Sequence, residues 1–291
     1  MTGLHLSAFR RAHSLGVAVI DLKKKLKMIT PLVSAPQSNL SVAWAHAFLS
    51  LREKGRSVRH PAVVTITGFA GSTQIEDADI RHRLDQELKS HGKKSCATVA
   101  GTIFPSSMWN PKLSNDMDVL FARYEHAWPG ISKCSPNRKG VYFRRLTAYQ
   151  PKTANAVPQN APVNQLKVMI DTYRTGNHRT SALQAAIFDP TRDHSPEPYL
   201  GFPCLQQVAF TPIGDDLLSV TGFYAKQLHF EKSYGNYLGL YELGRFVAKQ
   251  LGLKLAQVVC VTGCLESSDS KISKGALDDF EADIRRLLGV R

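Results

Sequence analysis

The stretch CLQQVAFTPIGDDLLSVTGFY, residues 204–224, decides the fold of this chain. Both of its ends are rich in β-branched and apolar residues, the composition that favours strands. Between them, Pro212 and the Gly214-Asp215 pair supply residues typical of a turn. The stretch therefore predicts a hairpin, and a hairpin among helices indicates an α+β domain rather than a strictly alternating parallel sheet.

The same patterns extend outward from the hairpin. Apolar residues recur at helical spacing in five segments, where we expect helices: 39–54, 77–91, 162–175, 236–253 and 275–289. Ser38 or Asn39 is a candidate cap for the first of these helices, and Gly252 is placed to end the fourth. Apolar and β-branched runs predict strands in four further segments: 63–67, 97–104, 181–188 and 257–262.

Composition divides the chain into four parts. Residues 1–27 form an N-terminal extension of uncertain role. They are either a tail that precedes a translation start at Met28, a secretory signal or an organelle transit peptide. Residues 28–150 form the N-terminal part of the domain. The stretch 151–163, which holds three prolines and few large apolar residues, predicts a loop or linker. Residues 164–291 form the second half, which carries the hairpin.

Net charge and cysteine usage bound the function. The formal charge of +13 favours an anionic partner, a nucleotide or a nucleic acid. The five cysteines suggest free thiols in a reducing compartment, so a cytoplasmic location is expected. Cys260 and Cys264 lack a second Cys/His pair at a matching spacing, so no metal is expected. The chain has no run of 18 apolar residues, so no membrane partner is expected.

Short motifs follow one another across the second half: Asn164-Gln165-Leu166, His178-Arg179, Phe188-Asp189-Pro190, Pro203-Cys204, Tyr224, Asn236 and Thr262-Gly263. In order and spacing, over about residues 165–265, they resemble the thymidylate synthase family, which includes the pyrimidine nucleotide hydroxymethylases. The resemblance implies a curved mixed sheet with packed helices, and a homodimer whose sheets pack back to back. It also implies a pyrimidine nucleotide as substrate, methylenetetrahydrofolate as one-carbon donor and no metal.

By this resemblance, Cys204 is the catalytic nucleophile. A thiolate that adds to C6 of a pyrimidine makes C5 nucleophilic, so one difficult step becomes two easier ones. The thiol must be partly ionised, which nearby cations promote. Asn236 would bind the base, because an amide donates to one of uracil O4 and N3 and accepts from the other. The alternatives are a packing cysteine and an asparagine that only caps a helix.

The remaining substrate contacts follow from the same alignment of motifs. Arg179 would reach the phosphate of the partner subunit's nucleotide, or be a solvated loop charge. Tyr224 is also an expected substrate contact. Lys226, two residues after it, would replace the family's phosphate-binding arginine as a point charge. His229 is the last expected substrate contact.

The sequence also departs from the family pattern. Leu205 stands where the family has histidine, and no counterpart of its upstream catalytic glutamate is found. Two functions therefore stay open. One is a methyl- or hydroxymethyltransferase acting at C5 of a pyrimidine nucleotide. The other is a catalytically silent family member that binds a nucleotide or nucleic acid as a sensor or scaffold.

Three features of the first half complete the set of candidates. Residues 137–149 interleave basic and aromatic side chains, which suits either nucleic-acid binding or an edge strand with a charged face. Trp109 and Tyr124 are placed either in a pocket or in the core. Asp116 and Asp118 are the nearest acids to a possible general base.

Overall fold

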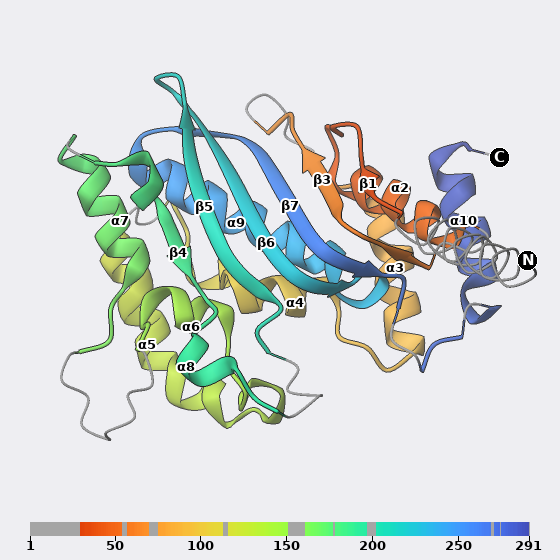
Figure 1. The fold of residues 1–291 in the computed structure, drawn as a ribbon, viewed down its shortest axis with the longest axis horizontal. Coiled ribbons are helices and arrows are strands. Elements are labelled where there is room, and N and C mark those ends of the chain that lie inside the picture. The colour runs from red at the N-terminus through yellow and green to blue at the C-terminus, as the bar shows by residue number, and fades with distance from the viewer. Residues whose placement is uncertain are drawn as a thin grey trace, which may run out of the picture.

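The computed structural model describes residues 30–53, 57–69, 75–112, 116–150, 161–176, 178–196, 202–268, 271–273 and 275–290. The expected extension 1–27 and most of the proline-rich stretch, 151–160, lie outside these ranges. The described residues form an open seven-stranded mixed sheet with helices packed against it (Figure 1), as the hairpin and the helical patterns predict. The strands are β1 (Leu32–Val33), β2 (Val58–Arg59), β3 (Ala62–Ile66), β4 (Gln184–Ala186), β5 (Leu205–Ile213), β6 (Leu217–Leu228) and β7 (Lys254–Glu266).

The long strands lie at the centre of the sheet, whose order is β1-β3-β7-β6-β5-β4, with β2 also paired to β7. The predicted hairpin is confirmed, because β5 and β6 pair antiparallel on either side of the turn at 214–216. The next connection runs from β6 through α9 (Tyr234–Leu251) to β7, which pairs parallel to β6. This crossover lays α9 across the strands that follow Cys204 (Figure 1).

The five predicted helices are confirmed. Asn39 caps the first, because its side chain accepts from the backbone N–H groups of Ser41 and Val42. Gly252, with φ of +73°, ends α9 in the left-handed conformation that glycine tolerates best. The other four predicted helices are α2 (Leu40–Arg52), α3 (Ala78–Ser90), α7 (Gln165–Arg174) and α10 (Asp278–Leu288).

Two expectations for the first half are wrong. Residues 97–104 are not a strand but most of helix α4 (Cys96–Ile103), which begins where the Ser95 hydroxyl accepts from the N–H of Thr98. The segment 137–149 contains no edge strand, because residues Tyr142–Thr147 form helix α6. The sequence patterns named above include no helix at α5 (Met117–Lys133), a helix that is capped by Asp116. The strand expected at 181–188 shortens to the three residues of β4.

Helix α9 packs closely against α4 at two glycines, where the side chains of Val99 and Ile103 and the backbone of α4 leave no room for a side chain on α9. A Cβ atom at Gly239 would lie 2.9 Å from the carbonyl oxygen of Ala100, and one at Gly235 would lie 2.7 Å from that of Cys96. Real Cβ atoms essentially never approach other atoms this closely. The Gly235–Gly239 spacing of four residues puts both glycines on one face of α9, so the two helices meet along a full turn.

The opposite side of α9 presses on the sheet in the same way. Gly222 of β6 leaves room for the side chain of Leu240, whose Cδ1 would lie 2.7 Å from an added Cβ. Gly244 sits over Val220, whose Cγ2 would lie 2.9 Å from an added Cβ. Helix α9 is therefore fixed between α4 and β6, and its position along β6 is set by these contacts.

The two halves of the chain share one hydrophobic core. Trp44 of α2 stacks on His229 and Phe48, with ring centroids 5.4 and 5.3 Å apart, and it meets Phe280 of α10 edge-on. All four of these side chains are almost completely buried.

Among the described residues, no helix combines the length and the apolar character needed to cross a bilayer.

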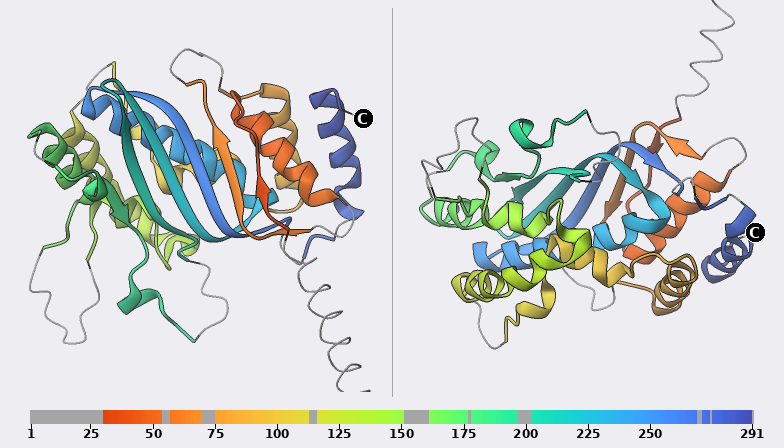
Figure 2. Two further views of the ribbon diagram at one scale, coloured as in Figure 1. Left: turned by 45° about the horizontal axis from the view of Figure 1, so that its top comes forward. Right: turned by 90° about the horizontal axis from the view of Figure 1, so that it is seen from below.

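The helices α4, α6 and α9 lie on one side of the sheet (Figure 2). In the described residues, no helix covers the other face of the central strands. On that face Phe223 is 43% exposed. Val259 and Val261 of β7 and Val63 of β3 are only partly buried there. An apolar sheet face is thus left open to solvent in the single chain.

The helix contact at Gly239 makes a direct prediction about stability. Changing Gly239→Ala should lower the free energy of unfolding by about 1–3 kcal/mol, because the added methyl group forces α9 away from α4. Gly101→Ala is the matched control: Gly101 also lies in α4, and an added Cβ there meets nothing within 4 Å. This control should be neutral or stabilising by up to about 1 kcal/mol. Urea unfolding followed by circular dichroism measures both, and equal effects would contradict the close contact.

Candidate functional site

Cys204 stands at the entry to β5, half-buried, with its main chain bonded on two sides. Its carbonyl oxygen accepts from the N–H of Ala225 at 3.1 Å, which ties it to β6. Its own N–H donates to the hydroxyl of Tyr142 at 3.3 Å, which ties it to α6. The thiol therefore sits where the sheet meets α6, on an element whose position is fixed from both sides.

A buried ion pair supports the segment that leads into Cys204. The guanidinium of Arg145 makes two bonds to the Asp193 carboxylate, at 2.8 and 3.0 Å, and both side chains are buried. Arg145 also lies over the ring of Phe202, 5.2 Å from its centroid. Tyr142 stacks on that same ring. Helices α6 and α8 (Pro190–Asp193) thus hold the Phe202–Cys204 stretch in place.

The surroundings of the thiol pull its pKa in two directions. Burial raises the pKa of Cys204, because the thiolate loses solvation. The positive charges of Lys232 and Lys226 lower that pKa, as does the bond with the Tyr142 hydroxyl. The effect of burial is the larger one, so the pKa of Cys204 lies above the ordinary range for a thiol. Lys226 is also paired with Glu266 at 2.8 Å.

The packing of α9 on β6 brings Asn236 to the same place. Going back along α9, Gly244 lies over Val220 and Leu240 over Gly222. Four residues of helix and two of strand each advance about 6 Å, so the next step places Asn236 over Tyr224. Tyr224 is the register partner of Leu205, the residue after the thiol. Tyr224 therefore lies beside the Cys204 segment, and the packing of α9 sets Asn236 above Tyr224 at the same end of β6.

This meeting point is polar and incompletely bonded. Asn236 is 4% exposed, and no hydrogen bond to its side-chain amide is found among the described residues. Within the same residues, the buried hydroxyl of Tyr224 and the buried Nε2 of Gln227 also lack partners. Burial raises the pKa of the Tyr224 hydroxyl, so this group is a neutral donor. Buried polar groups are normally satisfied, because leaving one unpaired costs about 1–3 kcal/mol. Gln227 lies toward β7, where its amide oxygen accepts from the hydroxyl of Thr262. The Tyr224 hydroxyl and the Asn236 amide are therefore the groups with hydrogen-bonding capacity left for a ligand near Cys204.

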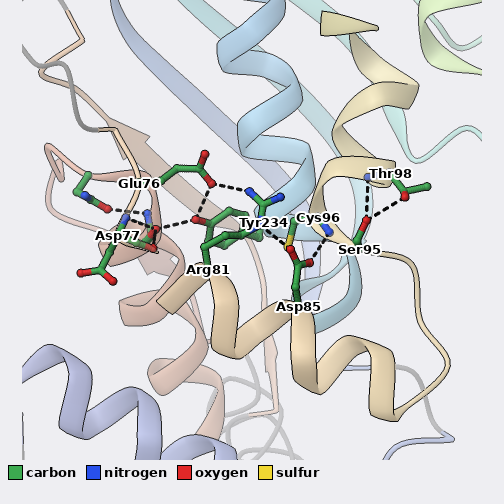
Figure 3. Close-up of polar contacts among 10 residues, drawn as sticks. Glu76, Asp77, Arg81, Asp85, Ser95, Cys96, Thr98 and Tyr234 are labelled. Carbon is green, nitrogen blue, oxygen red and sulfur yellow. Dashed lines mark hydrogen bonds and ion pairs between the residues drawn. The ribbon is translucent and has the colours of Figure 1, made fainter. Parts of the chain in front are cut away.

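A network of polar side chains holds the N-terminal end of α9 (Figure 3). The hydroxyl of Tyr234 donates to Glu76 at 2.8 Å and lies 2.6 Å from the hydroxyl of Ser41. Arg81 of α3 binds Glu76 at 2.6 Å and also binds Asp85. The Asp85 carboxylate in turn accepts from the N–H of Cys96, the first residue of α4. Helices α2, α3 and α4 are thus tied to α9 two residues before Asn236.

Two expected substrate contacts lie elsewhere. His229 is completely buried: it stacks on Trp44, and its Nε2 lies 3.0 Å from the carbonyl oxygen of that residue. Burial lowers the pKa of His229 to about 4, so the ring is neutral, and the site described here does not include it. Arg179 is exposed and lies before β4, whose partner on β5 is Ala209 rather than the Cys204 end. The chain does not bring its own Arg179 to its own thiol.

The other early candidates have structural positions. Tyr124 is buried in the core, whereas Trp109 is buried and also lines a cavity beside the C-terminal half of α9. Asp116 caps α5, and Asp118 pairs with Lys167 at 3.0 Å. Two residues at the thiol were missed, Tyr142 and Lys232. Tyr142 belongs to the basic and aromatic stretch 137–149, so a signal was present, but its link to Cys204 crosses 62 residues of chain.

No protein-family model matches this chain, and no curated protein does. The function must therefore be argued from the side chains near Cys204. In the described part of the chain, no group of three or more potential metal ligands is found.

The lysines beside the thiol make a second prediction. Lys232→Gln should shift the pH profile of Cys204 alkylation by iodoacetamide to higher pH, because a positive charge that favours the thiolate is lost. Peptide mapping by mass spectrometry reports Cys204 separately from the other thiols. Lys133→Gln, at the exposed end of α5, is the control and should leave the profile unchanged. A profile that stays in place in Lys232→Gln would refute the electrostatic coupling.

Proposed function

We propose that this protein is a transferase that acts at C5 of a pyrimidine nucleotide, with Cys204 as its nucleophile. The observation that carries the proposal is that the unbonded Asn236 amide and the Tyr224 hydroxyl lie at the end of β6 that borders the Cys204 segment. An amide and a hydroxyl beside a thiol match what a uracil ring offers, which is a donor and acceptor edge and an electrophilic C6. The resemblance to the thymidylate synthases supports the same assignment and the finer fold that it implies.

The proposed chemistry starts at the thiol. The Cys204 thiolate adds to C6, and the electrons of the C5–C6 double bond move onto C5 and O4. C5 then attacks a one-carbon electrophile, after which loss of the C5 proton and expulsion of the thiolate restore the double bond. Asn236 orients the ring and stabilises the charge that develops at O4. Because the pKa of Cys204 is raised, the nucleotide has to help ionise it or the reaction is slow at neutral pH.

Lysines near the thiol are suited to the nucleotide phosphate. Lys226 and Lys232 both act on the charge of Cys204, so both lie near it. Each offers a point charge rather than the bidentate fork of an arginine. Arg179 is placed to contribute only from a second copy, as the resemblance implies.

A bound folate would need a segment of the chain to cover it at the Cys204 site. No such segment follows β7 among the described residues. After β7 the chain continues to α10, which packs on α2 and α3. There Glu281 binds Arg52 at 2.6 Å and Asp283 binds Arg83 at 2.8 Å. Helix α10 thus lies beside α2 and α3, away from β5 (Figure 1), so no step is assigned to the folate. Methylenetetrahydrofolate is proposed as donor by resemblance alone.

We also propose that a second copy of the chain covers the open sheet face. Phe223, Val261 and Val63 present apolar surface there, and burial of such surface is the main driving force of association. A two-fold interface on this face would place the sheets back to back.

The adduct is the direct test of the enzyme. Incubation with 5-fluoro-2′-deoxyuridine monophosphate and methylenetetrahydrofolate should add the masses of both to the intact protein. Once C5 has attacked the one-carbon unit, fluorine cannot leave as a cation in place of the proton, so the thiolate is not expelled. Incubation without the folate measures the reversible adduct of the nucleotide alone. Cys204→Ser should abolish both adducts, since the nucleophile is gone. Asn236→Ala should slow their formation about tenfold or more, through loss of the bond to the base. Intact-protein mass spectrometry measures all three.

Cys134→Ser, which removes an exposed thiol on α5's C-terminal cap, is the matched control and should keep the adduct. An adduct that survives Cys204→Ser would rule out this nucleophile. Nucleotide binding without any adduct would favour the second candidate, a silent nucleotide-binding protein. The raised pKa of Cys204 is the observation that favours this candidate.

A charge introduced on the open sheet face tests the proposed dimer. Val261→Lys should convert a dimer into a monomer, because an ammonium group facing the partner sheet cannot be desolvated without a counter-charge. Sedimentation velocity measures the mass, and circular dichroism checks the fold. Lys89→Gln, on the exposed end of α3, should leave the mass unchanged. A wild-type protein that sediments as a monomer would contradict the interface.

A further inference from the structure

A cavity of about 280 Å³ lies at the C-terminal half of α9. Its walls combine aromatic and cationic side chains over an apolar floor from Leu253 and Leu255, around the start of β7. The aromatic and cationic side chains are Phe69, Trp109, Tyr241, Arg245, Lys249 and Lys254.

This cavity is separate from the Cys204 site. Arg245 follows Asn236 by nine residues, which is about 14 Å along the helix and half a turn around it. Lys254, at the start of β7, is ten residues before Cys264, the register partner of Lys226, so about 33 Å of strand lies between them. One small ligand cannot touch both places.

Arg245 lies over two of the cavity's rings, and two of the rings pack against each other. The guanidinium of Arg245 lies 5.9 Å from the ring centroid of Trp109 and 5.5 Å from that of Tyr241. The rings of Tyr241 and Phe69 are 4.8 Å apart. Arg245 also bonds Glu242 at 3.1 Å, a contact that uses only part of its five-donor fork. Its side chain is 43% exposed, so the fork is accessible from solvent.

We propose that this cavity binds a nucleobase that carries a phosphate. Aromatic side chains stack on bases of any sequence, while lysine and arginine hold the phosphate. A volume of about 280 Å³ is close to the lower end of the range for small-molecule sites and suits a single nucleotide unit. The net charge of +13 attracts such an anion over a distance.

The same chemistry is offered by a free nucleotide and by one nucleotide of a single strand. The cavity does not depend on the reaction proposed at Cys204. Nucleotide binding therefore tests the cavity, whereas formation of the 5-fluoro adduct tests the Cys204 site.

Fluorescence anisotropy of a labelled oligothymidylate of about ten residues tests the single strand, and competition by AMP tests the free nucleotide. The double variant Lys249→Gln/Lys254→Gln should weaken binding about tenfold and reduce the salt slope by about 2. Tyr241→Leu should weaken it about fivefold or more, because a stacking ring is lost while the bulk is kept. Lys89→Gln/Lys133→Gln removes the same charge elsewhere and should change affinity less than about threefold.

Competition by AMP assigns the cavity to a free nucleotide, and oligonucleotide binding that AMP does not displace assigns it to a strand. Both results support the site. Equal losses in the two double variants would overturn it, because the binding would then follow net charge alone. Wild-type affinity in Tyr241→Leu, or no binding of either probe up to about 1 mM, would also overturn it.

Discussion

The arrangement of this protein depends on how closely α9 approaches its two neighbours. Gly235 and Gly239 bring its backbone against α4, and Leu240 reaches into the space left by Gly222 of β6. Packing of this kind leaves almost no freedom to slide, because interiors are close-packed and respond to single methylene groups. Everything that α9 carries, the Asn236 amide at one end and the Arg245 guanidinium at the other, inherits its position from these contacts.

The region around Cys204 shows a balance between burial and reactivity. Burial makes the thiol less acidic, while two lysines and a tyrosine hydroxyl favour its ionised form. The unbonded groups of Asn236 and Tyr224 leave hydrogen-bonding capacity that a folded chain normally uses up. Such a site is costly to maintain without a ligand, and proteins keep costs of this kind where function requires them.

Much of the fold follows from local pattern, and the rest depends on distant contacts. The hairpin and the five amphipathic helices could be predicted because residues next to them in the sequence, such as Asn39 and Gly252, form their turns and caps. Residues 97–104 misled because threonine, valine and isoleucine favour strands, whereas the contact with α9 and the Ser95 cap select a helix. The order of the motifs identifies Cys204 and Asn236. That Tyr142 and Tyr224 lie near them could not be predicted from the sequence, because it depends on the register of a helix over a sheet.

The position of β3 has a consequence for biosynthesis. Ala62 on β3 pairs with Thr262 on β7, and Arg83 binds Asp283, both across most of the chain. At ordinary elongation rates, roughly 10–40 s pass between the ribosome's synthesis of one partner and of the other. During that interval the edge of β3 that pairs with β7 has no partner, and α2, which already packs on β3 and α3, still lacks α9 and α10. The nascent chain is therefore exposed to misassociation for longest at its beginning, and chaperones that act during translation have most to protect there.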